Sequence, residues 1–383
     1  MRFRMLFQRA VRNVLPNDPR HKTVNFSTRF CYVHRMKNSA ICSCHVRENN
    51  FLNKDSTTFP DSFDFLRPLY HCLAAQGITL QTVDQAPLTS FDAFLFIDMP
   101  PRNDPALRHA IQMRKPRILL LIENYFIRPR NHDYARLPEF TCAFTYDDVA
   151  VDTGLARKFN YTFALPMRIE TEYLSSKCAL ACMMFTNRKR TPKYMTYYRR
   201  LQTIDFFEKN HPDDFDLYGH EWDRGTALFQ TNHPNVHYHL RHLPLPRFRR
   251  PSWKGVSTNK LATFAPYRFV YCYENSEALP GYITEKIFDV MMAGSVPIYL
   301  GHPTTKRHIP ENCYIDRAHF ESEEALYRFI KSMPDDHYRR YLRAINTFIS
   351  TSQSAEFHQS RWVEHLFQTL TQQCVLEHHH GAQ

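Results

Sequence analysis

Short apolar runs alternate with amphipathic segments along most of this chain, and this alternation is the feature that most restricts its fold. In the first half, apolar runs at 78–83, 93–99 and 117–123 accompany segments with helical spacing at 61–77 and 104–115. Strands that alternate with helices form parallel sheets covered on both faces. The first half therefore predicts an α/β domain.

The second half repeats the pattern. Apolar runs at 178–187, 215–219, 267–275 and 295–301 are predicted strands, and they are interspersed with predicted helices at 193–210 and from about Thr284 onwards. Residues 219–260 are rich in His, Pro and Arg, which favours a loop. Amphipathic segments close the chain at 321–332, 335–350 and 355–373.

These patterns predict two doubly wound α/β domains that face each other across a cleft. The expected parts are a basic N-terminal arm at 1–47, an N-terminal Rossmann-like domain at 48–165, a C-terminal Rossmann-like domain at 166–350, a C-terminal helix at 351–375 and a tail at 376–383. The tail "LEHHHGAQ" is similar to a clipped purification tag.

The net charge of +11 is concentrated at the N-terminus, where residues 1–47 carry ten Lys/Arg and a single acid, Asp18. Residues 1–15 have apolar side chains at helical spacing with arginines between them. Such a segment can lie on an anionic membrane surface, and a solvated arm is the alternative. The chain has no apolar run of spanning length and no secretory signal pattern, so we expect a cytoplasmic protein, either free or peripherally bound to a membrane.

The ten cysteines have no framework spacing, which is typical of reduced thiols. Cys42, Cys44 and His45 come nearest to a metal cluster, but without a second spaced pair we expect ordinary thiols and no metal site. With only nine glycines, the chain also lacks both GxGxxG and the Walker-type loop. A bound nucleotide would need a different phosphate site.

The stretch from Tyr271 to Gly301 offers one. A predicted strand ends at Glu274–Asn275, and after a loop a helix begins at Tyr282–Thr284. The N-terminus of a helix presents free backbone N–H groups and partial positive charge, so it binds anions. Lys286 in the first helical turn is electrostatically unfavourable unless an anion such as a diphosphate lies there. The alternative is a surface lysine that extends away from the dipole.

The same stretch resembles the signature of the α1,3/4-fucosyltransferase family, glycosyltransferase family 10. The matching residues are Tyr267–Phe269, Glu274–Ser276, Tyr282–Lys286, Gly294, Val296–Pro297 and Gly301. Weaker similarity at 119–133, 217–224 and 309–322 extends the resemblance over roughly residues 50–350. It implies a GT-B fold, GDP-β-L-fucose as donor, and inverting transfer to a glycan acceptor containing N-acetylglucosamine, with O3 as the expected hydroxyl. No cofactor is expected to be required; a divalent cation would at most stimulate.

The resemblance also implies roles for individual residues. Lys286 and the helix N-terminus would stabilise the leaving diphosphate, Glu285 would contact the nucleotide-sugar, and Tyr282 would pack against the donor. Glu274, Asn275 and Thr284 would shape the same pocket, although capping the helix or bracing the loop is an alternative role for Glu274 and Asn275. Arg199 or Arg200 would contact phosphate, with Arg200 preferred.

On the acceptor side, Glu123 follows an apolar strand and is the expected general base, with Asp98 or Glu274 next in line. Asn124 and Arg128 are expected beside the acceptor.

Other functions remain open at this level. Asp214–Asp216 is a DxD triplet, which would suit a metal-dependent GT-A glycosyltransferase. The positive net charge suggests a nucleic-acid-binding protein as another alternative. The sequence has no RNA-binding signature or helix-turn-helix, so no nucleic-acid partner is expected. A GT-B enzyme with another nucleotide-sugar donor and a non-catalytic sugar- or nucleotide-binding protein are the remaining alternatives.

Overall fold

The structure, a computed structural model, describes residues 37–42, 48–49, 52, 65–163, 165, 177–187, 196–222 and 249–376. The chain divides into two compact units: Met1–Met167 together with Ala355–Gln383 is unit 1, and Arg168–Ser354 is unit 2. Each unit is described here by itself. The predicted helix at 1–15, Cys44, His45, most of the 219–260 loop and the tail lie outside the described residues. In the parts described, no helix is both long and apolar enough to cross a bilayer.

Unit 1 contains a six-stranded parallel sheet with the order β2-β1-β3-β4-β5-β6. Its strands are β1 (Asn38–Cys42), β2 (Thr79–Thr82), β3 (Ala93–Ile97), β4 (Arg117–Leu121), β5 (Cys142–Thr145) and β6 (Arg157–Lys158). Strands β3 and β4 are almost continuously buried, as expected when helices cover both faces of a sheet. The predicted parallel sheet is confirmed, although β1, β5 and β6 were not predicted.

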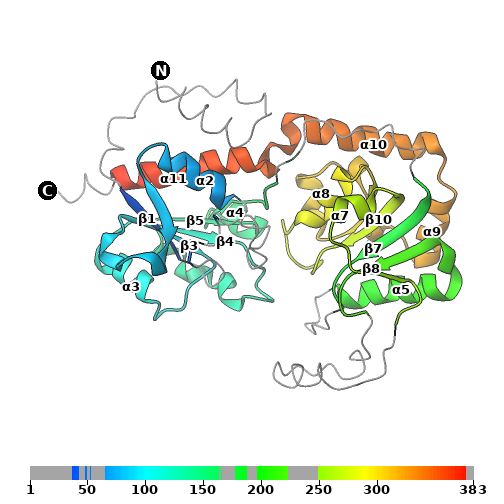
Figure 1. The fold of residues 1–383 in the computed structure, drawn as a ribbon, viewed down its shortest axis with the longest axis horizontal. Coiled ribbons are helices and arrows are strands. Elements are labelled where there is room, and N and C mark those ends of the chain that lie inside the picture. Colours follow the sequence, from blue (N-terminus) through cyan, green and yellow to red (C-terminus); the bar gives the residue numbers. More distant parts are fainter. Residues whose placement is uncertain are drawn as a thin grey trace. The chain divides into compact units, whose positions relative to one another are not determined.

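In the described part of unit 1, the helices that accompany this sheet (Figure 1) are α2 (Leu66–Ala74), α3 (Pro105–Gln112), α4 (Asp148–Asp152) and α11 (Gln359–Leu376). Helix α3 starts at Asp104, whose side chain accepts a hydrogen bond from the Leu107 nitrogen at 2.9 Å, with Pro105 at the first helical position. Its apolar side packs with Phe94 and Phe96 of β3 in one buried cluster.

Two expected boundaries are wrong. Residues 38–42 were assigned to the basic arm, yet they form β1, which pairs with both β2 and β3. The charge bias of the surrounding segment hid this short, buried strand. The C-terminal segment is also not a separate part, because α11 packs beside α2 in unit 1. Trp362 of α11 anchors it, with its ring 5.0 Å from that of Phe144 in β5.

Unit 2 contains a second six-stranded parallel sheet, with the order β12-β11-β10-β7-β8-β9. Its strands are β7 (Ala179–Met184), β8 (Phe215–Tyr218), β9 (Trp253–Gly255), β10 (Tyr267–Tyr273), β11 (Val296–Leu300) and β12 (Ile315–Asp316). Counted from β7, this is the 3-2-1-4-5-6 order of a Rossmann domain. Strand β9 lies within residues 219–260, which were predicted to form a loop. The sequence did not predict this strand because three residues are too few to show a strand pattern.

Helices cover both faces of this sheet (Figure 1): α7 (Lys260–Phe264), α8 (Glu285–Met292) and α10 (Asp335–Ser350) lie on one side, and α5 (Tyr197–Asn210) and α9 (Glu323–Lys331) lie on the other. Helix α8 buries Ile287, Phe288, Val290 and Met291. The packing of this buried face against the sheet holds the start of α8 beside the end of β10.

Candidate active site

The residues predicted to hold a donor gather at the carboxyl ends of the strands in unit 2. The strand order reverses between β7 and β10, and doubly wound sheets bind ligands outside the carboxyl ends of strands at such a switch point. Glu274 directly follows β10, and Thr196 directly precedes α5, the helix after β7. The Thr196 nitrogen donates to the Asn275 carbonyl at 3.1 Å, so the two segments meet at this point.

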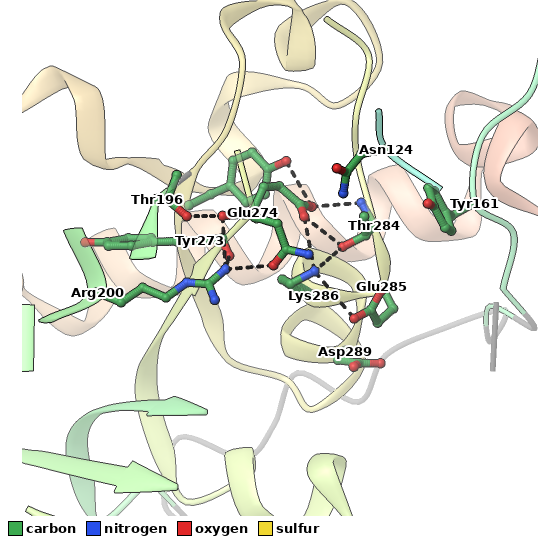
Figure 2. A network of polar contacts seen from close by, with 12 residues as sticks. Asn124, Tyr161, Thr196, Arg200, Tyr273, Glu274, Thr284, Glu285, Lys286 and Asp289 are labelled. Carbon is green, nitrogen blue, oxygen red and sulfur yellow. Dashed lines mark hydrogen bonds and ion pairs between the residues drawn. The ribbon is translucent and has the colours of Figure 1, made fainter. Parts of the chain in front are cut away.

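Glu274 is fully buried and braces the start of α8 (Figure 2). Its carboxylate accepts hydrogen bonds from the Thr284 nitrogen and the Thr284 hydroxyl, each at 2.8 Å. The Tyr299 hydroxyl donates to it at 3.2 Å from the neighbouring strand β11. Both carboxylate oxygens therefore have partners, so Glu274 acts as a brace for the loop and is a poor reserve candidate for the general base.

Lys286 lies in the first turn of α8 between two carboxylates. Its Nζ is 3.2 Å from Glu274 Oε2 and 3.6 Å from Glu285 Oε1, and it donates to the Thr284 hydroxyl at 2.7 Å. Burial acts to lower the pKa of Lys286, but Glu274 and Glu285 outweigh it, so the pKa lies above its usual value. The lysine keeps its charge at the helix N-terminus because a buried carboxylate compensates it, and a quarter of its side chain is still exposed.

Arg200 lies at the same place, on the buried side of α5. Its Nη2 donates to the carbonyls of Tyr273 and Glu274 at 2.6 and 3.0 Å and to Asn275 Oδ1 at 3.2 Å. Burial lowers the pKa of this guanidinium. The guanidinium's direct hydrogen-bond acceptors are neutral oxygens, while the nearby carboxylates of Glu274 and Glu285 oppose the effect of burial on its pKa.

Arg199 points elsewhere: its guanidinium lies 5.3 Å from the ring centre of the exposed Tyr198. The structure therefore brings Arg200, and not Arg199, to Glu274 and Asn275. Tyr282 is buried two residues before Thr284. Thr196 and Tyr299 were missed by the sequence analysis. In the sequence, Gly301 could have pointed to Tyr299. A Cβ at position 301 would come within 2.6 Å of the Tyr299 ring, so a glycine is needed there.

In unit 1, Glu123 lies two residues beyond β4, as predicted from its apolar run. Its backbone is fixed by two residues that were not predicted to do so. Asp98 Oδ1 accepts from the nitrogens of Ile122 and Glu123 at 3.0 and 2.9 Å, and Asn131 donates to the Glu123 carbonyl at 2.7 Å. Asn131 also donates to Asp98 Oδ1 at 2.8 Å.

The backbone of Asp98 has a φ of 63°, which is left-handed and strained for a non-glycine residue. With three donors on one oxygen, Asp98 is occupied as a brace, which weakens it as a reserve base. The Glu123 carboxylate itself accepts from the nitrogen and the side-chain amide of Asn124, at 3.0 and 3.1 Å. Asn124 is fully buried, so it holds the carboxylate in one orientation.

A cavity of about 780 Å³ opens at the switch point of the unit 1 sheet, between β1 and β3. Its lining includes the apolar side chains of Phe96 and Met99 and the charged residues Asp84, Asp98, Asp104, Arg128 and Arg130. Arg128, predicted to lie beside an acceptor, thus lines a cavity of substrate size.

The DxD triplet does not form a metal site in the structure. Asp214 binds the Lys331 ammonium at 2.7 Å and the Tyr327 hydroxyl at 2.8 Å. Asp216 binds the Tyr267 hydroxyl at 2.6 Å and lies 3.1 Å from the Lys254 ammonium. Both carboxylates therefore have cationic and hydroxyl partners, and the GT-A alternative disagrees with the GT-B fold of the chain. Among the described residues, no group of His, Cys, Asp and Glu could hold a metal ion.

Two parallel, doubly wound units, each with its polar residues at the carboxyl edge of the sheet, define an α/β protein of the GT-B fold. Residues 242–379 match the family model "Glycosyltransferase family 10 (fucosyltransferase) C-term".

Relatives with similar sequences are fucosyltransferases as well. The chain is 39% identical over 70 residues to an α-(1,4)-fucosyltransferase of Arabidopsis thaliana (18% of this chain, 17% of the relative). It is 36% identical over 104 residues to α-(1,3)-fucosyltransferase 7 of Rattus norvegicus (26% and 28%). It is 29% identical over 195 residues to GDP-fucose protein O-fucosyltransferase 3 of Gallus gallus (48% and 39%). The matched segments thus span well under half of these relatives.

Solved structures share the fold. An α1,3-fucosyltransferase aligns with a TM-score of 0.52 at 14% identity, over 88% of this chain and 90% of that one. An α1,3-fucosyltransferase with GDP aligns at 0.50 and 14%, over 97% of each chain. A DNA-modifying β-glucosyltransferase aligns at 0.51 and 10%, over 87% and 99%. At these identities the likeness concerns the fold.

Proposed function

We propose that the protein transfers L-fucose from GDP-β-L-fucose to a hydroxyl of a glycan acceptor with inversion, giving an α-fucoside. The observation that carries this proposal is the cationic site at the end of β10. Arg200 is buried there against neutral oxygens, and Lys286 is held charged at the start of α8. Glu274 and Lys286 lie within residues 242–379, the segment that matches the model of glycosyltransferase family 10.

On the donor side, the leaving group is a nucleoside diphosphate, which gains negative charge as the sugar bond breaks. The free N–H groups of α8, the Lys286 ammonium and the Arg200 guanidinium would stabilise that charge. Tyr282 and Glu285 would contact the donor, and Asn275 would orient Arg200, to which its Oδ1 is bonded at 3.2 Å. Support for a guanosine donor comes from the GDP of the α1,3-fucosyltransferase structure.

On the acceptor side, Glu123 would take the proton of the attacking hydroxyl as that oxygen bonds to the anomeric carbon and GDP leaves. The base must be held in place for this step, and the contacts from Asn124 and Asp98 do so. The neighbouring cavity with Arg128 would bind the acceptor. O3 of N-acetylglucosamine is the hydroxyl we propose.

The test is incubation with GDP-fucose and an array of glycans, with fucose incorporation measured by mass spectrometry and the anomer by NMR. We expect α-linked fucose on N-acetylglucosamine-containing glycans. GDP-mannose and UDP-glucose serve as matched donors. Transfer from one of these in place of GDP-fucose would assign another donor. GDP binding without transfer to any glycan would favour a non-catalytic protein.

A further inference from the structure

The loop between β10 and α8 is bound at Gly281 by a side chain that is not among the donor residues described above. At Gly281 the backbone has a φ of 73°, the left-handed conformation that glycine adopts without strain. In this conformation the Gly281 nitrogen donates a hydrogen bond to the Thr304 hydroxyl at 2.8 Å. Thr304 lies in the 3-10 helix η12 (Pro303–Arg307), which follows the carboxyl end of β11.

The Thr304 hydroxyl is itself oriented by His302. The ring Nδ1 of His302 accepts a hydrogen bond from the Thr304 nitrogen at 3.2 Å and lies 3.1 Å from the Thr304 hydroxyl oxygen. A nitrogen that accepts from a backbone N–H carries no proton, so the hydroxyl can donate to it. That leaves a lone pair of the hydroxyl oxygen for Gly281. One hydroxyl thus donates to the histidine and accepts from the loop.

We infer that Thr304, oriented by His302, is a positioning residue for donor binding. The inference rests on the proposed function, which places the donor against this loop. Tyr282 directly follows Gly281, and Thr284, the N-cap residue of α8, lies two residues after Tyr282. A shift of Gly281 therefore moves the tyrosine and alters the approach to the helix N-terminus. The two ends of the loop are fixed independently, by Arg200 at Asn275 and by Glu274 at Thr284.

The test compares Thr304→Val, which keeps the shape but loses the hydroxyl, with Thr304→Ser, which restores it. Thr347→Val makes the same chemical change at an exposed position of α10 and serves as the control. Calorimetry with GDP is expected to show binding weakened by about tenfold in Thr304→Val, the scale of one lost hydrogen bond. Thr304→Ser and Thr347→Val should bind as the wild type does. In turnover assays, KM for the donor should rise in Thr304→Val while KM for the acceptor and kcat stay unchanged.

A purely structural role would lower the melting temperature without changing GDP affinity well below that temperature, and this result would overturn the inference. Equal weakening in the Val and Ser variants would also overturn it. If Thr304→Val does not fold, His302→Leu tests the same relay without altering Thr304, and unchanged GDP affinity there counts against the inference. Absence of GDP binding by the wild type would contradict the proposed function itself. Normal wild-type binding with an unchanged Val variant contradicts this inference alone.

Discussion

The carboxylate of Glu274 bonds to Thr284 twice, through the backbone nitrogen and through the hydroxyl, each at 2.8 Å. Thr284 is the N-cap residue of α8, yet its side chain makes no capping bond to its own helix. Its hydroxyl turns instead to the strand end, where Glu274 is fully buried. The helix N-terminus, which carries partial positive charge, is therefore fixed to the sheet.

Glu274→Gln should reduce stability. The amide keeps one oxygen acceptor but brings an NH₂ group against donors and removes the charge that compensates Lys286. Leaving a buried donor or cation unpaired costs about 2–4 kcal/mol. Urea unfolding should show a loss of that order, and Glu311→Gln at an exposed position should show little change. An unchanged midpoint for Glu274→Gln would mean that the brace is dispensable.

Lys286→Met should weaken GDP binding. The variant keeps the length of the side chain and removes the charge, and a charge-assisted contact to phosphate contributes about 1.5–3 kcal/mol. This corresponds to a loss of about ten- to more than a hundredfold in affinity, measurable by calorimetry. Lys286→Arg should retain part of the affinity, and Lys209→Met on the exposed end of α5 should retain all of it. If Lys286→Met binds GDP with wild-type affinity, the diphosphate does not bind at the start of α8.

Glu123→Gln should fold and bind GDP normally but lose turnover by about 10²-fold or more, the usual effect of removing a general base. The glutamine oxygen can still accept the bonds from Asn124, so the local structure should persist. KM for the acceptor should change much less than kcat, because the base acts mainly in the transition state. Glu311→Gln is the matched control. Near-normal turnover of Glu123→Gln would mean that another group accepts the proton of the acceptor hydroxyl.

Stability should depend on pH through Lys177. Burial lowers the pKa of Lys177 from 10.5 to about 8, where its ammonium donates to the Ala265 carbonyl at 2.6 Å and to Ser295 at 3.0 Å. Between these two pKa values the unfolded chain binds more protons at this site than the folded one. The contribution of Lys177 to stability therefore rises with pH across that window.

This dependence is isolated by comparison with Lys177→Met. The free energy of unfolding of the wild type minus that of the variant should increase from about pH 7.5 to about pH 10.5. The increase should be on the order of 2 kcal/mol, reduced from the full linkage value because the lysine is only partly buried. Since every other group titrates in both proteins, a flat difference would show that the pKa of Lys177 is close to normal.

Local patterns predicted a good part of the fold. The apolar runs of β3, β4, β7 and β10 and the helical spacing of α5 and α10 are present in the sequence, and the structure has these elements. The preference for Arg200 over Arg199 also has a local basis. Arg200 shares a helical face with Thr203, Ile204 and Phe207, all buried in α5. Strands β6, β9 and β12 could not be predicted, because two or three residues carry too little periodicity, and the basic surroundings of β1 hid that strand.

The sequence by itself determined which residue types stand at the strand ends: a glutamate and an asparagine after β10, a glutamate after β4, and a lysine at the start of α8. Only the tertiary structure decided their partners. Asp98 and Asn131 are 33 residues apart, and Tyr299 lies 25 residues from Glu274. They meet because adjacent parallel strands end at the same edge of a sheet, while each crossover connection separates them along the chain. Such partners depend on strand order and register, which no local periodicity encodes.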